Sequence, residues 1–170
     1  KNKFVECFRL KNSKILGIIW HPERYKGLKQ IDKREREFYD PYHNAINNFL
    51  TNKKKQGFAP CIVSIHSFAP KLKLQTSRPW QIGVLWDRDT RMSELVIKEL
   101  AKLKNLCVGE NEPYSGRLKG DTLSKHATAN KLLHVLIEIR NDLISDKTGQ
   151  KFWAKTIKSV LIKSIQQLQE

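Results

Sequence analysis

Four short apolar runs, each bounded by turn or loop residues, constrain the fold of this chain more than any other feature. They lie at 61–65, 81–86, 106–108 and 134–139. The first, second and fourth are rich in β-branched residues, as buried strands are. Because helical patterns separate the later runs, the sequence predicts an α/β sheet with helices on both faces.

The remaining elements follow from periodicity. Residues 14–20 are typical of a strand, and 30–55 has helical spacing that Pro41 should kink or split. A helix is predicted over 93–103 with Ser93 as its cap, and a shorter one over 121–129. A long closing helix is predicted over 146–168, and its stripe of Trp153 and aliphatic residues indicates core packing.

The chain has 170 residues and a formal net charge of +15, from 32 Lys and Arg against 17 Asp and Glu. An excess of this size fits a polyanion such as nucleic acid. Most of the lysines are scattered between apolar residues, however, so we favour a solvated lysine-rich surface. No apolar run approaches the roughly 18 residues that cross a bilayer. We therefore expect neither a membrane nor nucleic acid as the partner.

The three cysteines are Cys7, Cys61 and Cys107. They are odd in number and lack a Cys-x-x-Cys spacing. Cys61 and Cys107 stand at the edges of apolar runs, which predicts reduced core thiols in a cytoplasmic protein.

Ionisable side chains gather where the predicted strands end. His66 follows the first run, Asp87-Arg88-Asp89 the second, and Gly109-Glu110-Asn111 the third, while Glu138 and Arg140 lie on the fourth. Ligands of open α/β sheets bind outside the carboxyl ends of the strands. Four such ends would place His, Asp, Glu and Arg around one crevice, so we expect an active site there.

The residues alone leave two roles open for each key side chain. Glu138 and Arg140 lie two positions apart and share a strand face, so they are either a structural ion pair or a general base with its charge partner. His66 is either a hydrogen-bonded structural residue or a metal ligand. A catalytic zinc takes three protein ligands, and none of the five histidines has a partner at metal spacing.

Five stretches, taken in order, resemble the N-formylglutamate amidohydrolase family. They are YDPYHNAI at 39–46, VSIHSFAP at 63–70, RPWQIGVL at 78–85, VGENEPYSG at 108–116 and HVLIEIRNDLI at 134–144. Any one of them is weak evidence, but the ordered set is specific. The resemblance covers roughly the C-terminal two-thirds of the family's pattern.

This resemblance implies a mixed, mostly parallel sheet related to that of zinc carboxypeptidases and aspartoacylase-like deacylases. It implies hydrolysis of the formamide of N-formyl-L-glutamate, or of a similar N-acyl amino acid, to formate and glutamate in histidine breakdown. Zinc would be the cofactor. By this analogy His66 matches a zinc ligand, and Glu138 resembles the general base at the end of a strand.

The small anionic substrate so implied carries two carboxylates, which suit the planar fork of arginine. The candidates to bind it are Arg78, Arg88 and Arg140. Asn111 and Tyr114 could line the pocket, although 111–116 is also a plausible turn. His126 could face the crevice from a short helix or lie exposed on it.

The sequence departs from the family at its start. Members carry an N-terminal stretch with a His-containing motif and a later Asn-Arg-Pro, which supply further zinc ligands and a substrate-facing Arg, and 1–26 does not resemble it. We expect residues 1–170 to form a single amidohydrolase-like domain that lacks N-terminal strands and has an unpaired sheet edge. The alternatives are a catalytically inactive truncated homologue or binding module that has lost zinc, and a basic nucleic-acid-binding protein, although no nucleic-acid-binding signature is present.

Overall fold

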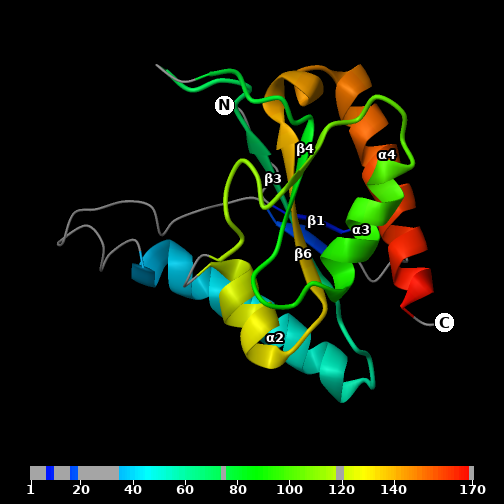
Figure 1. Ribbon diagram of the computed structural model, residues 1–170. Coiled ribbons are helices and arrows are strands. Elements are labelled where there is room, and N and C mark those ends of the chain that lie inside the picture. The colour runs from blue at the N-terminus through cyan, green and yellow to red at the C-terminus, as the bar shows by residue number, and fades with distance from the viewer. Residues whose placement is uncertain (1–6, 10–15, 19–34, 74–75, 118–120, 169–170) are drawn as a thin grey trace.

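A four-stranded sheet with the order β3-β6-β4-β5 forms the centre of the protein (Figure 1). The computed structural model describes residues 7–9, 16–18, 35–73, 76–117 and 121–168. The strands of the sheet are β3 (Ile62–Phe68), β4 (Ile82–Leu85), β5 (Val108–Glu110) and β6 (His134–Arg140). Each overlaps or adjoins one of the four apolar runs, so the predicted α/β sheet is confirmed.

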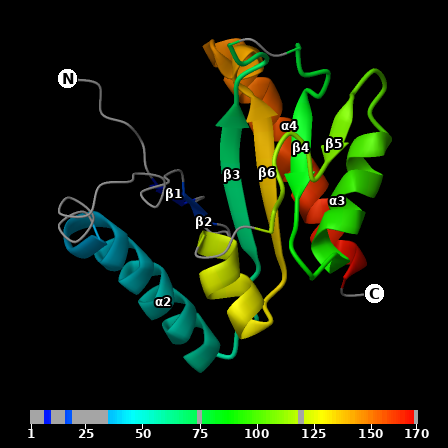
Figure 2. The same ribbon diagram turned by 60° about the vertical axis from the view of Figure 1, so that its left-hand side comes forward.

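Helices cover both faces of this sheet (Figure 2). On one face α3 (Arg91–Ala101) and α4 (Lys147–Gln167) pack against the side chains of Val135, Ile137 and Ile139. On the other face α2 (Asp40–Lys55) and the π-helical turn η3 (Leu123–Ala127) pack against Leu136. Successive residues of β6 therefore alternate between two apolar layers, as the period of a strand requires.

The direction of the strands corrects one expectation. β3 and β6 are parallel, and so are β4 and β5, but β4 runs antiparallel to β6. The sheet is thus mixed and mostly parallel, as predicted. The expectation that all four strands end around one crevice is wrong. The carboxyl ends of β4 and β5 lie at one end of the sheet, and those of β3 and β6 lie at the other end.

Of the two predicted helix signals, the break at Pro41 behaves as expected and the Ser93 cap does not. Asp146 caps α4, a feature that sequence reasoning missed, since its Oδ1 accepts a hydrogen bond of 2.7 Å from the backbone N–H of Gly149. At Pro41 the π-helical turn η2 (Glu35–Tyr39) has just given way to α2, because proline has no N–H for the carbonyl one turn earlier. The predicted Ser93 cap is wrong: α3 begins at Arg91, and Ser93 is buried in its first turn with Oγ donating to the Thr90 carbonyl.

The remaining elements are short. A separate antiparallel pair consists of β1 (Cys7–Arg9) and β2 (Leu16–Ile18), and the second of these lies within the strand predicted over 14–20. The single-turn helices are η4 (Thr128–Asn130) and η5 (Asn141–Ile144). The rest of the predicted strand and residues 30–34 of the predicted helix lie outside the described residues. Within the described ranges, β6 is the only strand that pairs with β3, and no helix is both long and apolar enough to cross a bilayer.

The cysteines differ from one another. Cys61 is partly buried against the α3–α4 side of the core, and burial raises the pKa of its thiol to about 12, with a smaller contribution from the Asp89 carboxylate. Cys107 is exposed, so the prediction of a core thiol is wrong at that position. The side chain of Cys7 lies outside the described residues.

Gly83 allows a loop to cross the sheet beside Glu138. A Cβ at position 83 would overlap the carbonyl oxygen of Glu112 and would lie 3.4 Å from the Cβ of Glu138. The loop that follows β5 therefore lies directly on β4 only because residue 83 has no side chain.

We expect Gly83→Ala to lower the free energy of unfolding by about 1–3 kcal/mol, because a backbone carbonyl must move to admit the methyl group. Gly57→Ala is the matched control, since its Cβ would have no neighbour within 4 Å and only the positive φ of 79° opposes it. Urea unfolding of both variants measures the difference. A Gly83→Ala protein as stable as the native one would contradict this account of the loop.

Candidate active site

His66 and Glu138 face each other across the two parallel strands. The register of β3 and β6 pairs residue 66 with residue 138, and His66 Nδ1 lies 3.7 Å from Glu138 Oε1. The side chains are 10% and 4% exposed, so both groups are withdrawn from bulk water. The sequence places these two residues 72 positions apart, and the sheet brings them together as the resemblance implies.

The hydrogen bonds around the pair leave one oxygen without a partner. Ser64 Oγ lies 3.0 Å from His66 Nε2, so that nitrogen is engaged on its own strand. Glu138 Oε2 is buried and has no hydrogen-bond partner among the described residues. A buried polar atom without a partner is costly, so Glu138 Oε2 is a candidate to bind a ligand, an ion or a water molecule.

Arg78 lies at the same end of the sheet as this pair. Its guanidinium carbon is 5.8 Å from the centre of the Phe68 ring and 5.1 Å from that of Tyr114. Nη1 donates to the carbonyl of Ala69 and to the Tyr114 hydroxyl, at 3.1 and 3.2 Å. Within the described ranges, Nε and Nη2 have no acceptor, so this face of the fork is available to a carboxylate. Phe68 and His66 share a face of β3, which places Arg78 at the same end of the sheet as the pair.

Arg140 has a different environment. Its Nε and Nη2 donate to the two carboxylate oxygens of Asp142, at 2.8 and 3.2 Å. Nη1 lies 3.5 and 3.4 Å from the carbonyls of Arg78 and Trp80. The suggested ion pair between Glu138 and Arg140 is therefore wrong. Arg140 instead ties the segment before β4 to the end of β6.

Asn111 and Tyr114 belong to the loop that crosses Gly83. Asn111 has a positive φ of 52°, and its Oδ1 accepts hydrogen bonds from the backbone N–H groups of Trp86 and Gly116, at 3.0 and 3.1 Å. The Asn111 side chain therefore fixes the conformation of the loop, which agrees with the interpretation of 111–116 as a turn. Tyr114 reaches the site through its contact with Arg78.

Arg88 is not brought together with these residues. It is exposed and follows the carboxyl end of β4, whose Leu85 pairs with Leu136. That end of the sheet lies beyond the start of β6, opposite to Glu138. Nearby, hydrogen bonds from Arg91 hold the pKa of Asp89 below its ordinary value.

His126 is buried in η3 rather than exposed on a helix. Its Nε2 lies 2.7 Å from Nδ1 of His43 on α2, and each residue is 4% exposed. The two rings stack with centroids 4.9 Å apart, and Tyr39 packs edge-on against His43. Burial lowers the pKa of His126, and the nearby Lys125 ammonium lowers it further.

Sequence reasoning missed three parts of this arrangement. They are the aromatic contacts that Phe68 and Tyr114 make with Arg78, the Asp142 partner of Arg140, and the hydrogen bond between His43 and His126. Asp142 is two residues from Arg140, a spacing that was visible in the sequence. The histidines are 83 positions apart and no local pattern joins them.

The described residues do not by themselves form a zinc site. A catalytic zinc takes three protein ligands and an open position. No group of three His, Cys, Asp or Glu side chains in the described part of the chain could hold a metal. His66 supplies one imidazole with Glu138 beside it, which suits one ligand and one base but leaves the ligand set incomplete.

Comparisons with known proteins identify the family and the fold. The family model described as N-formylglutamate amidohydrolase matches residues 17–145. The gene product Atu2144 of Agrobacterium tumefaciens has a similar structure, with a TM-score of 0.78 and 29% sequence identity over 86% of this chain and 58% of that one. The N-formylglutamate amidohydrolase of Ralstonia eutropha shares the fold, with a TM-score of 0.55 and 23% identity over 85% of this chain and 56% of that one.

One curated protein also matches, the Beta-glucosidase A of Acetivibrio thermocellus. It is 27% identical over 128 residues, which cover 75% of this chain and 27% of that protein. The chain thus spans a little over half the length of the two solved structures and about a quarter of the curated relative.

The structure defines an α/β protein with a buried imidazole and carboxylate at the carboxyl ends of two parallel strands. Because the family model matches most of its length, the chain belongs to the N-formylglutamate amidohydrolase family.

We expect stability to fall as the pH drops below the ordinary His pKa of about 6.5. In that range the unfolded chain binds a proton at His126 that the folded protein resists, so protonation favours unfolding. Urea unfolding between pH 7.5 and 5 measures the slope. His126→Gln should lose about 1–3 kcal/mol at neutral pH with the buried hydrogen bond and should show a smaller fall at low pH.

Lys125→Gln is the companion variant, because it removes the smaller cause of the lowered pKa of His126, together with the exposed contact of Lys125 with Tyr39. Its pH slope should lie between those of the native protein and His126→Gln. A His126→Gln protein with the native slope would show that this group does not set the pH dependence.

Proposed function

We propose that the protein containing this chain hydrolyses the amide bond of N-formyl-L-glutamate or a similar N-acyl amino acid. The observation that carries the proposal is the buried pair of His66 Nδ1 and Glu138 Oε1, 3.7 Å apart on adjacent parallel strands. Membership of the family supports the reaction class. The Nε and Nη2 groups of Arg78 have no acceptor among the described residues and lie at the same end of the sheet as His66 and Glu138. They support the proposal of an anionic substrate.

Glu138 acts as the general base. Its oxygens take a proton from the water that attacks the formyl carbon, and the same group then returns the proton to the leaving nitrogen. The C–N bond breaks, and formate and the free amino acid are released. The unpartnered Oε2 supports this role, because an oxygen that no described group engages can accept a proton.

Arg78 binds a carboxylate of the substrate. Phe68 and Tyr114 hold the guanidinium plane, and Ala69 fixes Nη1, so Nε and Nη2 are left as a fork of fixed orientation. Such a fork suits bidentate recognition of a carboxylate. Arg140 positions the segment that carries Arg78, while Asn111 and His126 keep the loop and the helical turn over the sheet in place.

Zinc is part of the proposal, with His66 as one ligand and the others supplied by residues outside the described ranges. When bound, the metal would polarise the formyl oxygen and lower the pKa of a water molecule. Substrate binding by Arg78 and proton transfer by Glu138 are the contributions of this chain.

A second candidate function is a catalytically silent binding module of the same fold. It is favoured by one observation, that no complete metal-binding group is found among the described residues. Metal analysis separates the two candidates. About one zinc per chain with release of formate supports the hydrolase, and metal-free protein without formate release supports the silent module.

Glu138→Gln should lower turnover of N-formyl-L-glutamate by about 10²–10⁴-fold, because the amide cannot take the proton. Zinc content should be unchanged, since the ligand His66 is untouched. Formate release and bound metal are the two measurements.

Glu94→Gln on the outer side of α3 is the matched control, because it makes the same chemical change at an exposed position. It should leave turnover as it was. Native activity in Glu138→Gln would remove Glu138 from the mechanism, even if zinc is bound.

Arg78→Lys should raise KM about ten-fold or more with a smaller change in kcat, because lysine cannot present the bidentate fork. The same substitution at Arg88 should change neither KM nor kcat, since that side chain lies at the opposite end of the sheet. Steady-state kinetics on the two variants test which arginine faces the substrate. A larger KM effect at position 88 would reverse the assignment.

A further inference from the structure

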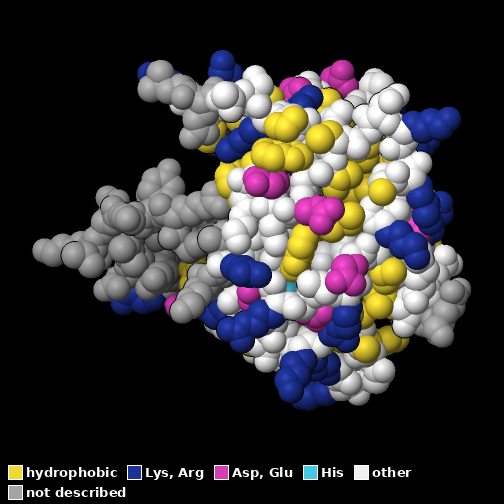
Figure 3. Space-filling model, in the orientation of Figure 1, with side chains coloured by type: hydrophobic (Ala, Val, Ile, Leu, Met, Phe, Trp, Pro, Cys, Tyr) yellow, Lys and Arg dark blue, Asp and Glu magenta, His cyan; other side chains and the backbone are white. Residues whose placement is uncertain are grey.

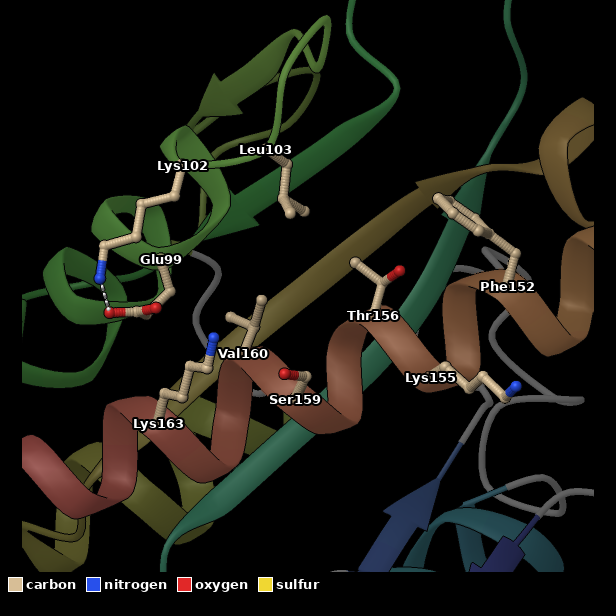
Figure 4. A pocket seen from close by; sticks show the side chains of 9 residues that line it. All are labelled: Glu99, Lys102, Leu103, Phe152, Lys155, Thr156, Ser159, Val160 and Lys163. Atoms are coloured by element: carbon tan, nitrogen blue, oxygen red, sulfur yellow. Dashed lines mark hydrogen bonds and ion pairs between the residues drawn. The ribbon is translucent and has the colours of Figure 1, made fainter.

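A groove between α3 and α4 lies on the outer side of the helical layer, on the face of the sheet away from the site. It encloses about 400 Å³. Leu103, Phe152 and Val160 provide apolar surface, and Lys102, Lys155 and Lys163 are also lining residues, with the Lys102 ammonium paired to Glu99 (Figure 4). Leu103 is 40% exposed and Phe152 60%.

The apolar surface is more open to water than folding requires. Phe152 precedes the buried Trp153 and packs edge-on against it, so one ring faces the core and the other faces the groove. Large exposed apolar side chains with a polar rim mark interaction surfaces, and aromatic residues provide much of the binding energy at such surfaces.

The charge at the groove is positive. Lys155 and Lys163 of α4 line it, and α4 has no acidic residue between Lys147 and Gln167. The nearby carboxylate of Glu99 is engaged by Lys102 and by Gln167, so it offers little opposing charge. Blue and yellow side chains both reach the surface along the right-hand side of Figure 3, where Figure 1 places these helices.

The shape and length of the charged surface narrow the choice of partner. Lys155 and Lys163, the two lysines of α4 that line the groove, are eight residues and thus roughly 12 Å apart at the rise of an α-helix, which is too far for one small anion to contact both. A membrane or a DNA duplex presents a broad surface to such a face, whereas an apolar groove accepts the side chains of a single segment. Acidic residues flanking apolar ones would meet the lysines and the groove together.

We propose that the α3–α4 groove binds an acidic amphipathic polypeptide segment that inserts large apolar side chains between Leu103 and Phe152. The lysines of α4 steer the segment and pair with its carboxylates. The groove lies on the far side of the sheet from Glu138, so this interaction is independent of the proposed hydrolase activity.

The test uses a fluorescein-labelled helical peptide of about 15 residues, with Leu and Phe on one face and Glu elsewhere. Fluorescence anisotropy should show binding in the micromolar range. Raising NaCl from about 50 to about 300 mM should weaken it about ten-fold, because salt screens the rim charges. Phe152→Ala and Lys155→Glu should each weaken binding about ten-fold with unchanged unfolding midpoints.

Lys55→Glu is the matched control, since it makes the same charge change at an exposed position on α2. It should reduce binding less than two-fold. A second peptide with its apolar residues changed to Ala should bind at least ten-fold more weakly than the first.

Four outcomes would overturn the proposal. They are no binding at low salt, equal binding of the two peptides, native affinity in Phe152→Ala, and equal loss in Lys55→Glu and Lys155→Glu. A short DNA duplex and vesicles containing phosphatidylserine serve as competing probes. Displacement of the peptide from the groove by either one at lower concentration than unlabelled peptide would assign the face to that partner instead.

Discussion

The parallel pairing of β3 with β6 is the interaction on which the candidate site depends. Its register sets His66 opposite Glu138, and both strands belong to the four-stranded sheet. A slip of one residue would turn Glu138 toward α3 and α4, into an apolar layer where a carboxylate is costly. The alternation of β6 between two apolar layers therefore fixes the position of the carboxylate as well as the fold.

The site contains polar side chains within otherwise apolar surroundings. The residues around it leave room for these side chains and hold them in place. Gly83 leaves room for the loop that carries Tyr114, and Tyr114 in turn holds Arg78 against Phe68. Arg140 joins the same segment to the end of β6 through carbonyl contacts. Strand β6, Gly83 and Tyr114 thus position the Arg78 guanidinium at the same end of the sheet as His66 and Glu138. The chain that contains them belongs to an amidohydrolase family.

The two faces of the sheet differ in polarity. The face covered by α2 and η3 contains the candidate site and the buried His43–His126 hydrogen bond, whereas the strand side chains under α3 and α4 are mostly apolar. Five of the 32 Lys and Arg residues lie on α4, the outer helix of that second face. Two of them, Lys155 and Lys163, lie beside exposed aromatic and aliphatic side chains.

Sequence by itself determined the elements and the two central residues. Apolar runs of strand length and the helical stripe of 146–168 are local signals, so a few neighbouring residues are enough to recognise each of them. The ordered motifs also pointed to the family and singled out His66 and Glu138. Only the tertiary structure decided that β4 runs against β6, and hence that Arg78 lies at the same end of the sheet as the pair while Arg88 lies at the opposite end. Strand direction depends on packing between segments far apart in the chain, and no short-range periodicity records it.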